Sequence, residues 1–123
     1  MQLTRETATV NLIRAWEPGR IRIGDQWIGG HVIVSPDRII ADWRITDPAA
    51  LTLAELAPAV ELQPEIILLG TGAATLLTDI DLMGELAQQA IGLEIMSTAA
   101  ACRTFNVLAH EQRRVVAALY NAP

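Results

Sequence analysis

The sequence Glu65-Ile66-Ile67-Leu68-Leu69-Gly70-Thr71-Gly72 decides the fold. It is a short apolar run that ends at two glycines, which is typical of a strand buried on both faces of a parallel sheet. Downstream, the chain alternates between helical and extended patterns: a helix from Thr78, a strand over 93–96, a helix from Ser97 or Thr98 to about Glu111, and a strand over 115–120. This order predicts a largely parallel layer covered by helices.

The preceding residues, 1 to about 44, show the alternation of strands instead. The expected strands are Val10–Trp16, Ile21–Ile23, His31–Val34 and Ile39–Trp43. Turn residues separate them, and the turn at Ser35-Pro36-Asp37-Arg38 predicts a hairpin. Thr52-Leu53-Ala54-Glu55 is a capping box that starts a short helix to about Val60. Because no repeat or linker interrupts the chain, we expect a single α/β domain over residues 1–123 with an N-terminal antiparallel β portion.

The composition excludes several classes of function. The formal charge of −5 argues against a nucleic-acid partner, because phosphate binding needs clustered cations. All nine basic residues are arginine, so Schiff-base chemistry, pyridoxal phosphate attachment and a phosphate-loop lysine are absent together. No stretch approaches the roughly 18 apolar residues of a membrane span, and the first residues lack a signal pattern. We therefore expect a cytoplasmic protein.

Gly70, Thr71 and Gly72 follow the predicted buried strand, and open α/β sheets bind ligands beyond such strand ends. A dinucleotide fingerprint would need a small residue at Thr75 and a helix that opens at once, whereas the helix signals wait until Thr78. The pattern favours a tight turn over a nucleotide site. Ser97 and Thr98, at a predicted helix start near the same sheet edge, add a candidate site for a small anion.

Cys102 and His110 are the obvious nucleophile–base pair to test. Eight residues apart on one helix, they are separated by about 12 Å, whereas a hydrogen bond needs about 3 Å. Cys102 lies on the apolar stripe of that helix, so we expect an inert buried thiol. Asp79 and Asp81 suit the dipole of a helix start better than a cation. With two histidines and one cysteine at no ligand spacing, we expect neither a metal site nor a cofactor.

The outer face of the last predicted helix is the candidate partner surface. It carries Ala100, Arg103, Val107 and His110. Ala100 and Val107 are apolar where water is expected, which favours a partner-binding or oligomer face. The alternative is an ordinary solvated helix face.

Five stretches, taken in order, form a recognisable pattern: residues 29–36 followed by Trp43, residues 64–72, residues 92–98, residues 101–108 and residues 111–115. Over nearly the whole chain the pattern resembles a widespread family of small domains of unknown function. Its members include mitochondrial respiratory complex I assembly factor 3 and the adipogenesis-associated domain protein of animals. The chain departs from the pattern at Phe105, where tyrosine is common, and at Gln112, where glycine is frequent.

The resemblance implies a three-layer α/β sandwich with a central mixed sheet, and no established enzyme activity or cofactor. In the mitochondrial relative it implies a role in protein assembly. Together with the missing catalytic set, this favours a non-enzymatic protein-interaction or assembly-factor-like module that binds a protein partner or itself. The alternative is a small-molecule or anion-binding domain, or a minor enzyme, that uses Gly70–Gly72 and Ser97–Thr98.

Overall fold

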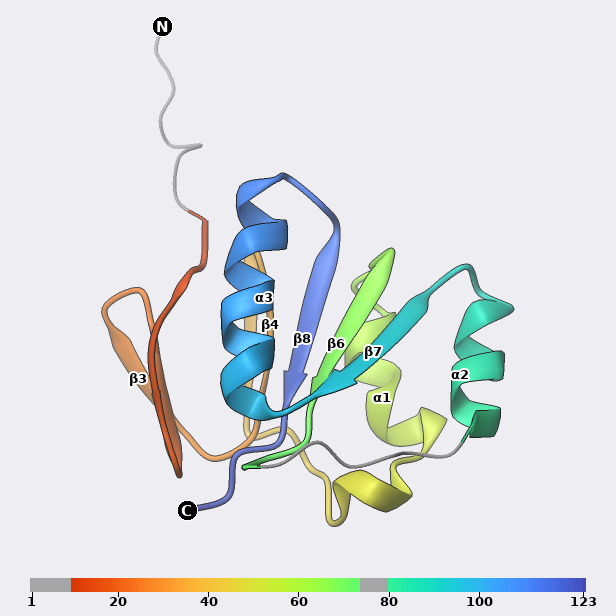
Figure 1. Cartoon of the computed structure of the whole chain (residues 1–123), viewed down its shortest axis with the longest axis horizontal. Helices are drawn as coiled ribbons and strands as arrows, with labels where there is room; N and C mark the ends of the chain where they lie inside the picture. Colours follow the sequence, from red (N-terminus) through yellow and green to blue (C-terminus); the bar gives the residue numbers. More distant parts are fainter. Residues whose placement is uncertain (1–9, 74–79) are drawn as a thin grey trace, which may run out of the picture.

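The computed structural model describes residues 10–73 and 80–123, and a five-stranded sheet forms its centre (Figure 1). The strands are β4 (Val32–Ser35), β5 (Arg38–Ala41), β6 (Ile66–Gly70), β7 (Gly92–Met96) and β8 (Val115–Leu119). Their order across the sheet is β5-β4-β8-β6-β7. The β7, β6 and β8 strands are parallel, whereas β4 runs antiparallel to both β8 and β5. The predicted mixed sheet is therefore confirmed.

The predicted N-terminal antiparallel portion is a separate three-stranded sheet, made of β1 (Ile13–Glu17), β2 (Arg20–Ile23) and β3 (Gln26–Gly29). We call this sheet the meander. Pro18-Gly19 links its first two strands, and Gly19 takes a positive φ of 92° that suits glycine. The sequence pattern missed β3, because a strand of only four residues after Gly24-Asp25 looks like an extension of the turn.

In the described residues, the strands are connected by three α-helices and one 3-10 turn: η2 (Pro48–Ala50), α1 (Leu53–Val60), α2 (Ile80–Ala87) and α3 (Thr98–His110). The capping box before α1 forms as predicted, because the Thr52 hydroxyl accepts the Glu55 amide and the Glu55 carboxylate accepts the Thr52 amide. Ser97 caps α3 by accepting the amide of Ala100. The predicted helix start at Thr78 lies outside the described residues.

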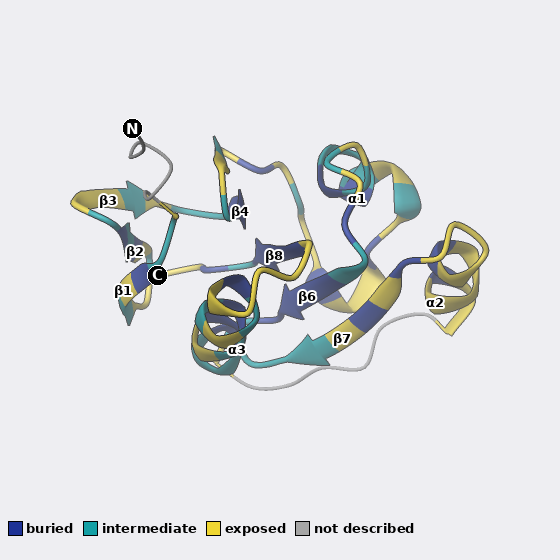
Figure 2. Cartoon of the chain, turned by 90° about the horizontal axis from the view of Figure 1, so that it is seen from above, coloured by how far each residue is buried: buried dark blue, intermediate teal, exposed yellow. Residues whose placement is uncertain are grey.

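The elements form three layers (Figure 2). On one face of the central sheet, α3 and the meander enclose a core that includes Ile21, Leu68 and Phe105. On the other face, α1 and α2 cover a second core that includes Leu56 and Leu86. Strands β6 and β8 contribute side chains to both cores. Their sequences are therefore continuous apolar runs, without the alternation of a strand that is buried on one face.

In the described part of the chain, each of the three α-helices is followed by a residue with left-handed backbone. Gln63 after α1 has a φ of 57°, Ala90 after α2 has a φ of 62°, and Gln112 after α3 has a φ of 63°. Gly92, the first glycine after α2, does not end that helix and is the first residue of β7. Glycine is the usual choice in such helix ends, because it adopts positive φ without a steric cost. The departure at Gln112 therefore keeps the backbone shape that glycine would favour.

Candidate functional site

The turn after β6 is tied to the start of α3. Thr98 is fully buried, and its hydroxyl donates to the carbonyl of Tyr120 at 2.6 Å while it accepts the amide of Gly72 at 2.8 Å. The Thr98 amide donates in turn to the carbonyl of Gly72 at 2.8 Å. The two segments therefore bond to each other through side chain and backbone.

The remaining members of the predicted anion site also have internal partners. The Thr71 amide and hydroxyl both donate to the carbonyl of Met96, at 3.0 and 3.2 Å, and the carbonyl of Gly70 accepts the amide of Tyr120. Ser97 caps α3. The structure thus brings the predicted residues together at one sheet edge. An anion there would have to compete with these bonds, so anion binding at this turn stays a prediction.

The predicted partner surface lies along α3. We define the α3 face as Ala100, Arg103, Val107, His110 and Glu111. All of these residues except the half-buried Ala100 are exposed, and the Val107 side chain exposes 57% of its surface. Among the described residues the exposed large apolar side chains are those of Val10, Trp27, Ile80, Met83 and Val107, and Val107 is the one that lies on α3. The opposite side of α3 buries Ala101, Cys102, Phe105 and Ala109.

Asn106 joins α3 to the meander at the free edge of β1. The Ile13 amide donates to Asn106 Oδ1 at 2.8 Å, and Asn106 Nδ2 donates to the Ile13 carbonyl at 2.8 Å. The side chain thereby forms the two hydrogen bonds to Ile13 that the backbone of a neighbouring strand would form. A hollow of about 360 Å³ beside it is lined by Leu12, Asn106, Val107, His110 and Glu111. The α3 face therefore sits on a helix that is held firmly in place.

The possible nucleophile and its bases lie apart. Cys102 is only 4% exposed, and burial raises the pKa of its thiol to about 12, so it stays protonated near neutral pH. His31 stacks on Tyr120 with ring centroids 4.4 Å apart, and its Nδ1 accepts the amide of Asn121 at 2.8 Å. His110 lies on the exposed side of α3. Neither imidazole activates the thiol in this arrangement.

Acidification below pH about 6.5 is expected to destabilise the fold through His31. Burial lowers the pKa of His31, so the folded state binds fewer protons than the unfolded state, and the free energy of unfolding falls as the pH drops from about 6.5 through the folded pKa. Protonation also removes the Nδ1 acceptor for Asn121. Urea unfolding from pH 8 to 5 should show this loss in the wild type and a smaller one in His31→Phe. Equal slopes for the two proteins would contradict it.

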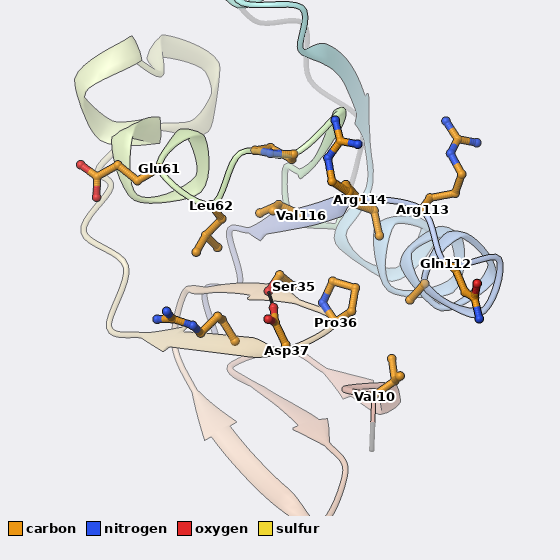
Figure 3. Close-up of a pocket in the computed structure, with 14 residues that line it drawn as sticks. Val10, Ser35, Pro36, Asp37, Glu61, Leu62, Gln112, Arg113, Arg114 and Val116 are labelled. Atoms are coloured by element: carbon orange, nitrogen blue, oxygen red, sulfur yellow. Dashed lines mark hydrogen bonds between the residues drawn. The ribbon is translucent and has the colours of Figure 1, made fainter. Parts of the chain in front are cut away.

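A cavity of about 530 Å³ opens at the other end of the sheet, where β8 begins. Figure 3 shows Leu62 and Arg114 on one side of it and Pro36 and Asp37 on the other, with Val10 at its edge. The β4–β8 ladder ends at Val34 and Ala117, and Pro36, two residues beyond Val34, has no N–H with which to extend it.

No local pattern in the sequence predicts this cavity, because its lining comes from four separate stretches, at residues 10, 35–38, 61–64 and 109–116. Its charged side chains are of both signs: Arg38, Arg113, Arg114, Asp37 and Glu61. Arg113 pairs with Glu65 at 3.1 Å, which lowers the pKa of Glu65. The mixture of charges selects no single class of ligand.

Two general findings bear on the kind of site. Within residues 10–73 and 80–123, no three or more His, Cys, Asp or Glu side chains gather as a metal site would require. No helix in that part of the chain is long and apolar enough to cross a membrane.

The fold and the α3 face define a three-layer α/β domain with a strongly held helix exposed on one side. Residues 13–120 match the family described as protein of unknown function (DUF498/DUF598). The chain belongs to that family, as the sequence pattern predicted.

Individual proteins agree with this assignment. The zebrafish (Danio rerio) NADH dehydrogenase [ubiquinone] 1 alpha subcomplex assembly factor 3 is 29% identical over 98% of this chain, which covers 70% of that protein. A crystal structure of a Bordetella parapertussis protein is 33% identical with a TM-score of 0.85, and the alignment covers 93% of this chain and 98% of that one. A solution structure of a Bordetella pertussis protein, titled an Mth938-like domain, is 27% identical with a TM-score of 0.80, over 98% of this chain and 92% of that one.

Proposed function

We propose that this chain is a non-enzymatic protein-interaction module with an assembly-factor-like role, and that the α3 face is its binding surface. The observation that carries the proposal is the 57% exposure of Val107 in the middle of a helix whose other side is locked into the core. Protein–protein contacts place apolar side chains at the centre and polar ones at the rim, and Val107 lies in this way among Arg103, His110 and Glu111. Relatives that are named assembly factors support the same role.

The Val107→Asp variant is expected to lose the partner. A carboxylate at the centre of a dry contact loses its hydration without gaining a partner charge, so affinity should fall at least tenfold. The measurement is affinity capture from an extract of the cells that make the protein, followed by mass spectrometry. Met83→Asp is the matched control, because Met83 is 40% exposed on α2, on the other face of the sheet.

A protein that the wild type and Met83→Asp capture and that Val107→Asp loses supports the proposal. Circular dichroism and urea unfolding must first show that both variants fold. An identical set of captured proteins for all three chains would show that the α3 face is not the binding surface. The predicted cytoplasmic location belongs to the same proposal, and cell fractionation tests it.

A second candidate function, small-molecule binding, draws on the cavity of about 530 Å³, a size typical of ligand pockets. The sequence placed this alternative at the Gly70–Gly72 turn, at the opposite end of the sheet. A melting-temperature screen against anions, nucleotides and cofactors tests both places at once. Ligand-induced amide shifts around residues 70–72 or around residues 112–116 would then tell them apart.

A further inference from the structure

We infer that the α3 face binds a second copy of this chain, with the two α3 helices antiparallel and a two-fold axis at Val107. The inference rests on the proposed function, since it names the partner of the same surface. The reason lies in the order of charges along the helix. Arg103 is four residues before Val107, and Glu111 is four residues after it.

A two-fold axis at one residue of a helix pairs every position before it with the position equally far after it. With the axis at Val107, Arg103 of each copy faces Glu111 of the other, which gives two symmetric ion pairs around an apolar centre. Thr104 and His110 face each other in the same way. The surface is therefore complementary to itself in charge.

These two charged groups are free for such a contact. Among the described residues, the ion pairs involve Arg20, Arg22, Arg44 and Arg113, so neither Arg103 nor Glu111 takes part in one. Glu111 acts on Arg113 only through the weakest of the influences that raise the pKa of Arg113. Arg103 and Glu111 cannot reach each other within one helix, since eight residues span about 12 Å.

The shape of the surface also suits a second helix. Arg103, Val107 and Glu111 follow one another at intervals of four residues, and such rows form the ridges that interdigitate in the commonest class of helix packing. A hollow of about 360 Å³, lined by Leu12, Asn106, His110 and Glu111, adjoins Val107 on this face.

The test exchanges the charges. Sedimentation equilibrium from about 10 μM to 1 mM covers the range in which a small interface of this kind associates. The mass of the wild type should rise above the 13.3 kDa of one chain toward twice that value. Arg103→Glu and Glu111→Arg should each weaken the dimer roughly tenfold, because two attractive pairs become two repulsive ones.

Two combinations make the test specific. An equimolar mixture of Arg103→Glu and Glu111→Arg should form a mixed dimer, because every facing pair is then attractive. The double variant Arg103→Glu/Glu111→Arg should return to within about threefold of wild-type affinity. If net charge alone controlled association, Glu111→Arg, the less negative variant, would dimerise more strongly than the wild type.

A wild type of 13.3 kDa at every concentration overturns the inference, as does a dimer that the single variants do not weaken or a mixture that stays monomeric. The proposed function fails separately. A monomeric chain that captures another protein through Val107 would retain the binding surface and lose only the second copy as its partner.

Discussion

The Gly70→Ala variant is expected to unfold about 2 kcal/mol more easily than the wild type, because the interior has no room for one methyl group. A Cβ at position 70 would lie 2.9 Å from Cα of Thr98, 3.0 Å from its Oγ1 and 3.1 Å from Cδ2 of Leu119. Thr98 and Leu119 are both fully buried, and Cα of Thr98 belongs to the backbone, so the contact is relieved only by moving α3 away from β6. Urea unfolding measures the change.

Gly84→Ala is the matched control and should have the opposite sign. A Cβ at Gly84 meets nothing within 4 Å, and the residue lies in the interior of α2. Alanine favours a helix over glycine by about 0.5–1 kcal/mol, so this variant should be more stable than the wild type. If Gly70→Ala were as stable as Gly84→Ala, the close contact between β6 and α3 would be disproved.

The Asn106→Leu variant is expected to lose about 2–3 kcal/mol, because the Ile13 amide and carbonyl would keep no partner at a half-buried edge. Leucine fills a similar volume, so the loss reports the two hydrogen bonds rather than a cavity. Hydrogen exchange gives the specific readout, since the Ile13 amide should lose its protection. Arg103→Leu, three residues away on the exposed side, should change stability by less than about 0.5 kcal/mol. Equal stability of the two variants would show that Asn106 does not hold the meander.

The sequence predicted the parallel half of the fold because local signals there agree with the tertiary structure. The apolar run of residues 65–69, the capping box at Thr52 and a helix start at Ser97 or Thr98 are local signals, and the structure has the strand, the capping box and a cap at Ser97. The meander was less predictable, because strands of four or five residues carry few alternations. Its third strand depends on pairing with β2, which is a contact that no local pattern reports.

The candidate surfaces also differ in how far they can be predicted from the sequence. The exposure of Val107 could be predicted, since one helix fixes which residues share its face. The two hydrogen bonds between Asn106 and Ile13 join residues 93 positions apart, and the cavity in Figure 3 is lined by four separate stretches, so neither can be predicted from a local pattern. The hydrogen bonds of Thr98 could not be predicted from a local pattern either, because they also join residues far apart in the sequence. Its residue type suggested a helix start, but not that Gly72 and Tyr120 already use its hydroxyl.

These features assign different roles to the two sides of α3. The inner side, with Phe105 and Cys102, fixes the helix on the sheet, and the outer side presents Val107 without a covering element among the described residues. A rigid helix loses little conformational freedom when it binds, which favours its use as a docking surface. In the proposed dimer, α3 of a second copy covers this side.

Oxidative cross-linking of a Val107→Cys variant tests that claim most directly. Packed helices with axes 8–10 Å apart bring facing Cα atoms to about 4–5 Å, which a disulfide can span. Cys102 adds little background, because its pKa of about 12 keeps the thiol protonated. We predict that mild oxidant converts Val107→Cys into a covalent dimer much faster than Met83→Cys. A Val107→Cys chain that remains monomeric, or that cross-links no faster than Met83→Cys, would contradict the account.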